Sequence, residues 1–288
     1  KTGCKYTLGL SATPNRADGL SKVFQWHLGD IVFKINKREE ENVKVMLIQY
    51  EPTVINTSSG VALDESDLEE QSYEMNNGIV EGYNKVVLNY NKKPNMAQMI
   101  NNICSYFPRT KKIINETVAC LKEGRKILIL SDRREHLRII KDELDKTEYT
   151  SGYYLGGMKE KDLEETECKQ VILGTFMMAS EGFDCRYPLD TIILASPKSN
   201  IEQAVGRILR QEAKDRKFIP LVIDILDEFS TFSGQCFKRV KFYQKNKYNI
   251  ELYNMNGDKI HNKFVKKKEK KKPVQLDYPG SDFLEDSN

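Results

Sequence analysis

From residue 95 to residue 247, the chain alternates between two patterns of apolar positions. Runs of consecutive apolar residues are typical of buried strands, whereas apolar residues spaced three or four apart predict amphipathic helices. Because the two patterns take turns, this segment predicts an α/β fold, a parallel sheet with helices packed on it. The predicted strands are Lys126–Ser131, Gly152–Leu155, Gln170–Gly174, Thr191–Ala195 and Ile219–Ile225. The predicted helices are Lys111–Lys122, Arg133–Lys146, Lys159–Thr166, Ile201–Arg210 and a long one from Thr231 to about Lys247.

Local signals predict where three of these helices begin or end. Gly124 follows the first helix, at a position where helices often stop on a glycine. Asp132 with Glu135, and Ser199 with Glu202, have the spacing of a capping box, in which two side chains satisfy backbone N–H groups at the helix start. We therefore expect a side-chain cap at the start of both of these helices.

The rest of the chain is less regular. Residues 7–14 resemble a buried strand that runs into a turn, Leu20–Leu28 resembles a helix, and Val43–Tyr50 alternates like a strand. Residues 56–77 form an acidic insert to which we assign no mechanism. The resulting segments are 1–30, a connecting region 31–95, the α/β domain 96–247, and a basic, then acidic tail 248–288 that we expect to be disordered.

The helix within Ser199–Gln211 has two faces with different requirements. One face is apolar and explains packing on the sheet, while the other carries Gln203, Gly206, Arg207 and Arg210. A glycine inside a helix costs about 1 kcal/mol relative to alanine, so we expect a close approach to the backbone there. The neighbouring guanidinium groups match the paired oxygens of a polyphosphate. The alternative interpretation is a solvated helix face with a tolerated glycine.

The carboxyl ends of the predicted strands define one edge of the sheet. Ligands of open parallel sheets bind at that edge, where helix N-termini add N–H donors for anions. Small, hydroxyl-bearing and basic residues follow the strands, and we expect them to gather on one rim together with the arginine helix. They are Asp132, Arg133, Arg134, Gly156, Gly157, Thr175, Ser180–Asp184 and Ser196–Asn200. Each alone fits a structural role, since paired glycines form turns and Thr175 is able to cap a helix.

Composition narrows the class of protein without identifying it. Charged residues make up 30% of the 288 residues, and no apolar run approaches the roughly 20 residues that cross a bilayer. Six scattered cysteines without a Cys-x-x-Cys pair indicate free thiols in a reducing, intracellular compartment and no metal site. The net charge of +3 says little about partners. The N-terminus shows no signal peptide. Because the chain begins with Lys1 rather than methionine, we expect it to be part of a longer protein.

The long C-terminal helix mixes basic and aromatic residues. They are Phe237, Lys238, Arg239, Lys241, Phe242, Tyr243, Lys245, Lys247 and Tyr248. Such a mixture is able to stack the bases of a single strand, but an amphipathic helix with its apolar side packed is the preferred interpretation. The run Lys266–Lys272 is either a patch that binds polyanions or a solvated tail.

Three stretches resemble motifs III, V and VI of the superfamily-2 helicases and translocases. They are Ser11-Ala-Thr-Pro14, Gly174-Thr-Phe-Met-Met-Ala-Ser-Glu-Gly-Phe-Asp184 and Gln203-Ala-Val-Gly-Arg-Ile-Leu-Arg210, in the family's order. The strand Ile127–Asp132 resembles motif IV. The run Ala12–Phe24 is similar to the branch that holds XPB-like translocases, phage recombination helicases and the transcription helicases of large DNA viruses. The resemblance covers about residues 7–247.

The resemblance implies a fold and a set of ligands. Enzymes of this family close two RecA-like lobes around ATP and Mg²⁺, so the parallel sheet would be the second, C-terminal lobe and residues 1–30 the end of the first. Arg207 and Arg210 would be arginine fingers for the γ-phosphate, with Gln203 sensing the phosphates. Asp184, with Gly182, would contact the ribose or hold the arginines in place, and Gly206 would also lie at the nucleotide. Nucleic-acid phosphates would be bound by Thr175, Arg133, Arg134 and Lys198, and Ser11 and Thr13 would couple ATP to lobe closure.

The departures from the family pattern concern the nucleotide. The chain has no Gly-x-x-x-x-Gly-Lys-Ser/Thr loop and no Asp-Glu-x-His/Asp box, which hold the phosphates and Mg²⁺. We therefore expect the first lobe to hold most of ATP and Mg²⁺, and this chain alone to be inactive as an ATPase. The expected partners are nucleic acid, DNA rather than RNA, and the first lobe of the same protein, with no membrane. A viral enzyme of transcription or repair, in the host cytoplasm or the virion, is the expected setting.

Two other classes of protein remain alternatives. A non-catalytic nucleic-acid-binding module of helicase fold is one, although it would have no need for both Arg207 and Arg210. The motor part of a restriction endonuclease subunit is the other, but no convincing Pro-Asp…Glu-x-Lys nuclease pattern is present. A Rossmann dehydrogenase is disfavoured because no Gly-x-Gly-x-x-Gly follows a strand.

Overall fold

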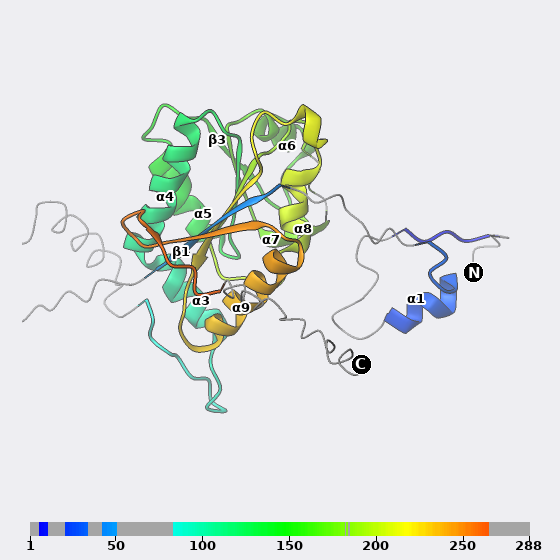
Figure 1. Cartoon of the computed structure of the whole chain (residues 1–288), viewed down its shortest axis with the longest axis horizontal. Coiled ribbons are helices and arrows are strands. Elements are labelled where there is room, and N and C mark those ends of the chain that lie inside the picture. Colours follow the sequence, from blue (N-terminus) through cyan, green and yellow to red (C-terminus); the bar gives the residue numbers. More distant parts are fainter. Residues whose placement is uncertain are drawn as a thin grey trace, which may run out of the picture. The chain divides into compact units, whose positions relative to one another are not determined.

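The computed structural model describes residues 6–10, 21–33, 42–50, 83–181, 183 and 185–264 (Figure 1). The chain divides into two compact units, residues 1–41 and residues 42–288. Among the described helices, none combines the length and the apolar character that a membrane span requires.

The second unit is built on one sheet of eight strands. These are β1 (Lys44–Gln49), β2 (Ile127–Leu130), β3 (Ser151–Tyr154), β4 (Val171–Gly174), β5 (Thr191–Leu194), β6 (Leu221–Leu226), β7 (Asn249–Tyr253) and β8 (Lys259–Ile260). Their order is β3-β4-β2-β5-β6-β1-β7-β8, and every pair is parallel except β7 with β8. The predicted α/β fold with a parallel sheet is confirmed.

Helices cover both faces of the sheet. Successive residues of a strand point to opposite faces, so each strand contributes side chains to two core clusters. Leu128 and Leu130 of β2 pack into one core cluster, whereas Ile127 and Ile129 pack into another. Figure 1 shows the two helical layers on either side of the strands. The layer over Ile127 and Ile129 consists of α3 (Met96–Ser105), α4 (Phe107–Lys122) and α5 (Arg134–Leu144). The other consists of α6 (Glu160–Glu167), α7 (Phe176–Glu181), α8 (Glu202–Gly206) and α9 (Ser230–Lys245), with the short 3-10 helices η1 (Arg207–Leu209) and η2 (Ala213–Asp215) nearby in the chain.

Two segments that we expected outside the domain belong to its sheet. The strand predicted at Val43–Tyr50 was assigned to a connecting region, but β1 lies between β6 and β7. The expected tail from residue 248 begins with β7 and β8. Val45 and Leu47 of β1 and Leu252 of β7 are buried in the same core cluster. These pairings join residues about two hundred positions apart, so no local pattern reveals them.

The helix boundaries follow the local signals only in part. Gly124 has a φ of +85°, and its N–H bonds to Leu121 O at 2.9 Å just beyond α4, which confirms the predicted stop. The capping box predicted for α5 is wrong, since the helix begins at Arg134 with no side-chain cap. The Asp132 carboxylate is held by a lysine from another loop, and Glu135 by Arg138 of its own helix. Neither carboxylate is therefore available to the helix start.

In the first unit, the expected buried strand is not formed within the described residues. Residues 6–10 have no regular structure, and Leu8 and Leu10 are 81% and 88% exposed. A strand needs a neighbour to bond its backbone, and the described part of this unit supplies none. The helix predicted at Leu20–Leu28 is confirmed as α1 (Ser21–Leu28), which Gly29 ends with a φ of +83°.

Candidate functional site

The helix that was predicted to carry Arg207 and Arg210 is shorter than expected and ends before both of them. The α-helix α8 ends at Gly206, and the chain continues as the 3-10 turn η1. Its apolar face is confirmed, because Ile201, Val205 and Ile208 are buried in the core cluster under α7–α9. The polar face is therefore fixed in direction by this packing.

The capping box predicted at the start of α8 is wrong. Ile201 is the N-cap residue and makes no side-chain hydrogen bond to the helix. Asn200 Oδ1 accepts the N–H of Glu202 at 3.3 Å instead. Asparagine is as good an acceptor for such N–H groups as serine, and here it lies one residue closer.

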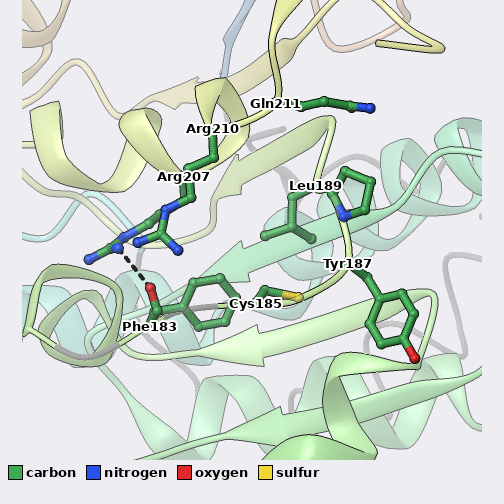
Figure 2. Close-up of a pocket in the computed structure, with 8 residues that line it drawn as sticks. Phe183, Cys185, Tyr187, Leu189, Arg207, Arg210 and Gln211 are labelled. Atoms are coloured by element: carbon green, nitrogen blue, oxygen red, sulfur yellow. Dashed lines mark hydrogen bonds between the residues drawn. The ribbon is translucent and has the colours of Figure 1, made fainter. Parts of the chain in front are cut away.

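Main-chain carbonyls hold the Arg207 guanidinium. Nε donates to Ala179 O at 2.6 Å and Nη2 to Ser180 O at 3.1 Å. Nη1 donates to Phe183 O at 2.7 Å, the bond that Figure 2 shows. Ala179 and Ser180 lie in the last turn of α7, where helical carbonyls lack an N–H partner from their own helix. The half-buried Arg207 thus fastens η1 to the end of α7.

The neighbours of Arg207 on the polar face are open to solvent. Gln203 and Arg210 are both exposed. Gly206 has helical angles, φ −55° and ψ −20°, and a Cβ added there would meet no heavy atom within 4 Å in the described part of the chain. Packing within the domain therefore does not require a glycine at this position. The predicted close approach to Gly206 stays a prediction.

A small cavity adjoins the two arginines. Its volume is about 20 Å³, enough for about one water molecule. Figure 2 shows the side chains around it, which are Phe183, Cys185, Tyr187, Pro188, Leu189, Arg207, Arg210 and Gln211. A nucleotide is far larger than this space, so it would lie against the surface of this domain and not inside it.

Arg207 and Arg210 line the small cavity together with Pro188 and Leu189, which precede β5. The arginines thus lie toward the amino ends of the strands, and our expectation of one shared rim is wrong. A second cavity of about 210 Å³ is lined by Ile208 and Gln211 together with Lys126, Asp190 and Pro220. The last three residues directly precede β2, β5 and β6. The eight residues of α8 and η1 span about 12 Å, enough to run back along a four-residue strand.

At the carboxyl ends of the strands, an ion pair joins two loops. Lys198 Nζ lies 3.1 and 3.0 Å from the two carboxylate oxygens of Asp132, and 5.3 Å from the centre of the Phe176 ring. The N–H of Asp132 donates to Ser196 Oγ at 2.8 Å. The loops that follow β2 and β5 are therefore fixed against each other, with Lys198 half-exposed.

The other predicted residues of this edge face different neighbours. Arg133 donates to Asn101 Oδ1 at 2.5 Å and to Ala97 O at 3.1 Å, both in α3. Arg134 donates to Gly156 O at 3.0 Å, in the loop after β3. Thr175 Oγ1 accepts the N–H of Met178 at 3.4 Å, which is the helix-capping role. The structure thus spreads these groups along the edge and does not gather them around one point.

A buried ion pair between Arg109 and Asp227, which we did not predict, lies beneath the carboxyl ends of the strands. Arg109 of α4 is fully buried and contacts both carboxylate oxygens of Asp227, at 2.8 and 2.9 Å. It also donates to Ala195 O at 2.6 Å, while Tyr83 OH donates to the same carboxylate at 2.5 Å. Burial alone would lower the pKa of Arg109, but the Asp227 charge outweighs burial and raises it.

A second pair repeats this arrangement on the opposite face. Arg239 of α9 contacts both oxygens of Asp224 in β6, at 3.1 and 2.8 Å, and Tyr243 OH donates to Asp224 at 2.9 Å. Nη1 of Arg239 donates to Lys198 O at 2.8 Å. We had placed Arg239 among the basic residues of an exposed or packed helix, and it is buried. The signal that could have revealed the pair is Asp224 itself, a carboxylate within the apolar run Leu221–Leu226.

A buried histidine contacts both α4 and the residue that follows β2. His136 Nδ1 lies 3.1 Å from Ser131 Oγ, and Nε2 lies 3.1 Å from Thr110 Oγ1. Burial, together with the charge of Arg109, lowers the pKa of His136 to about 3. The imidazole is therefore neutral and serves as a hydrogen-bonding spacer between α4 and the carboxyl end of β2.

Four predicted site residues, Ser11, Thr13, Gly182 and Asp184, lie outside the described residues. The acidic insert at 56–77 and the run Lys266–Lys272 lie outside them as well.

Several viral proteins are similar to this chain. A protein of Acanthamoeba polyphaga mimivirus named "Putative ATP-dependent RNA helicase" is 34% identical over 257 residues, covering 88% of this chain and 44% of that protein. A protein of African swine fever virus with the same description is 28% identical over 260 residues, covering 84% of this chain and 46% of that protein. The chain thus spans about half the length of these relatives.

No protein-family model matches the chain. Among solved structures, the crystal structure of T4 UvsW aligns over 75% of this chain and 42% of that chain, with 16% identity and a TM-score of 0.49.

Proposed function

Because the chain belongs to the superfamily-2 helicases as their C-terminal RecA-like lobe, we propose that it works in an ATP-dependent helicase or translocase that moves along nucleic acid. One observation carries this proposal, namely that two groups of polar residues lie at opposite ends of the same strands. Arg207 and Arg210 lie toward the amino ends, and Thr175 and Lys198 follow the carboxyl ends. A lobe that senses ATP at one end and holds a strand at the other converts each ATP-driven movement of the lobe into a step along that strand.

At the amino ends, the proposed ligand is the γ-phosphate of ATP. The exposed guanidinium of Arg210 has the paired donors that phosphate oxygens accept, and Arg207 joins it while fixing the end of α7. Gln203 would sense the phosphates, and Gly206 leaves the surface beside them open. Arginines of this kind act by neutralising charge as the phosphoryl group is transferred. Gly182 and Asp184, on either side of Phe183 in the chain, are proposed to contact the ribose.

At the carboxyl ends, the proposed ligand is the phosphate backbone of a nucleic acid. Lys198, Arg133 and Arg134 supply cations along this edge, and Thr175 a hydroxyl. Binding through the backbone is insensitive to sequence and weakens steeply with salt. We propose DNA as the nucleic acid, in a viral enzyme of transcription or repair, because Ala12–Phe24 resembles that branch of the family. The names of the two viral relatives specify RNA, so the experiment below compares both.

The first lobe is proposed to hold ATP and Mg²⁺ and to complete the catalytic site. The 288 residues contain no loop of the Gly-x-x-x-x-Gly-Lys-Ser/Thr type, and the two relatives are more than twice as long as the part they share with this chain. The exposed Leu8 and Leu10 fit a strand that pairs within that lobe, with Ser11 and Thr13 directly after it. The proposal therefore includes that the 288-residue chain alone hydrolyses no ATP.

The test is an ATPase assay on the full-length protein with and without oligonucleotides. We expect Arg210→Lys to lower turnover at least about tenfold with little change in KM for ATP, because lysine keeps the charge but lacks the paired donors. Arg138→Lys is the matched control, since Arg138 is an exposed arginine paired with Glu135 and Asp142 on α5. Single-stranded DNA should stimulate turnover more than RNA of the same sequence.

Unchanged turnover of the Arg210→Lys enzyme would remove Arg210 from the site. Turnover by the 288-residue chain alone, above a buffer blank, would contradict the assignment of ATP to the first lobe. If RNA stimulates turnover more than DNA does, the proposed nucleic acid is RNA, and the rest of the proposal is unchanged.

A further inference from the structure

One face of α9 is basic, aromatic and free of carboxylates. None of the sixteen residues of this helix is Asp or Glu. Its inner side is packed as the preferred interpretation predicted, with Tyr243 buried together with Tyr248 just beyond the helix. Its outer side exposes Phe237, Lys238, Lys241 and Lys245, and Phe237 retains 53% of its accessible surface. We call these four residues the outer face of α9.

The charges of this face are not neutralised, in contrast to those of α5. On α5, Arg138 pairs with Glu135 and Asp142, and Lys141 with Asp145 directly after the helix. Within the described ranges, Lys238, Lys241 and Lys245 form no ion pair. A helix that is merely solvated gains from mixing the two signs of charge, so a one-signed face indicates an anionic partner.

The exposed ring of Phe237 indicates which class of anionic partner this face binds. Lys241 Nζ lies 4.5 Å from the centre of the Phe237 ring, so the ring and a cation form one unit on the surface. Surfaces that combine lysines with an exposed ring bind single nucleic-acid strands, because the ring stacks a base while the lysines hold phosphates. The bases of a duplex are already stacked and offer no free face to Phe237.

The location of the face fits a strand that comes from the carboxyl edge of the sheet. Arg239 lies in the same turn of α9, and its guanidinium donates to Lys198 O at 2.8 Å. The turn of α9 that holds Lys238 is therefore joined to the loop of Lys198 through the Arg239 side chain. From Lys238 to Lys245 the helix rises about 10 Å, which extends the row of cations away from that loop.

We propose that the outer face of α9 binds a single nucleic-acid strand, with its lysines on successive phosphates and one base stacked on Phe237. The site adds a contact that none of the resemblance-derived residues supplies. It rests on the proposed function in one respect, namely that the strand passes Lys198 before it reaches α9.

The experiment measures binding of a labelled single-stranded oligonucleotide to the full-length protein, without nucleotide, over a range of salt concentrations. The triple change Lys238→Ala, Lys241→Ala and Lys245→Ala should weaken binding at least about tenfold. It should also make the slope of log affinity against log salt shallower by about 2, since each lost phosphate contact removes about 0.7. Phe237→Ala should weaken binding about fivefold or more, whereas Phe237→Trp should retain it, because a base still finds a ring.

The matched control removes three lysines from the opposite end of the domain. Lys122→Ala, Lys146→Ala and Lys214→Ala change the net charge equally, and these exposed residues lie at the end of α4, after α5 and in η2, before β6. We expect their combination to leave affinity and salt slope unchanged. An equal loss in this control, or an unchanged slope in the α9 variant, would overturn the proposal. A Phe237→Ala protein with full affinity for single strands would also overturn it.

Turnover without nucleic acid separates this inference from the proposed function. The α9 variants should keep the basal ATPase rate of the unaltered protein. If the full-length protein hydrolyses no ATP but the α9 variants lose strand binding, the helicase proposal fails and this one stands. If ATP is hydrolysed and strand binding is unaffected by the α9 changes, the opposite holds.

Discussion

Arg109 and Arg207 are each held by several hydrogen bonds, but the consequences of moving them differ. Arg109 is fully buried, and Asp227 neutralises it through both carboxylate oxygens. Arg207 is half-buried and donates to three carbonyls, two of them at the end of α7. Moving Arg109 would leave a buried charge without its partner, whereas water is able to replace Arg207 at a helix end. Arg109 is therefore fixed as part of the fold. Arg207 is able to exchange its hydrogen-bond partners, which a residue that contacts a ligand has to do.

The largest expected effect comes from breaking the buried pair. Asp227→Ala would strand the Arg109 cation in the interior, which costs about 3–5 kcal/mol of unfolding free energy. Urea unfolding of the 288-residue chain measures this loss. The matched control is Glu123→Ala, because Glu123 is the exposed partner of Arg125 and their pair should contribute less than about 1 kcal/mol. A loss below 1 kcal/mol for Asp227→Ala would show that Arg109 is not locked.

The next effect is a dependence on pH that originates beside Arg109. His136 has a pKa of about 3 in the folded chain and an ordinary value of 6.5 when unfolded. Between these values only the unfolded chain binds the proton, so the free energy of unfolding falls as the pH falls from 6.5 toward 3. The slope from this one residue is at most about 1.4 kcal/mol per pH unit. Unfolding of His136→Gln, followed across the same range, should show a shallower slope, and an equal slope in both proteins would contradict the assignment.

A smaller effect is expected at Arg207. Arg207→Ala removes three hydrogen bonds, but the released carbonyls gain water, so the loss should be about 1–2 kcal/mol. Arg207→Lys should recover part of it, since an ammonium still reaches some of these carbonyls. Thermal and urea unfolding of both variants measure the difference. If Arg207→Ala lowers the free energy of unfolding as much as Asp227→Ala does, Arg207 is as necessary for the fold as the buried Arg109.

The smallest effect has the opposite sign. Gly206→Ala should raise the free energy of unfolding by up to about 1 kcal/mol, because the backbone is helical and the space for a Cβ is empty. The same variant of the full-length protein should lose ATPase activity if a ligand or the first lobe approaches this surface closely. Destabilisation of the chain by Gly206→Ala would indicate a packing role that the open space does not show.

The sequence predicted those parts of the molecule that depend on local patterns. The five strands between residues 126 and 226 were found because each is a short apolar run. The inward face of α8 and η1 was found because Ile201, Val205 and Ile208 recur at helical spacing. The positions of β1 and β7 were not predictable in this way, because their partners lie far away in the chain.

The site was predicted in its residue types but not in its arrangement. The sequence predicts that Arg207 and Arg210 share a helix with an apolar opposite face, whereas α8 ends at Gly206 and both arginines follow it. Asp224 shows the limit most clearly, since a carboxylate in an apolar strand predicts a buried cation without saying that Arg239 supplies it.

The position of β1 has a practical consequence for anyone who prepares this lobe for experiments. A fragment cut at residue 96, where the α/β alternation begins, would lack a strand from the interior of the sheet. Two open edges, on β6 and β7, would then be available for pairing with other molecules, which favours aggregation. A preparation of this lobe therefore has to include β1 and to begin at Asn42 or earlier.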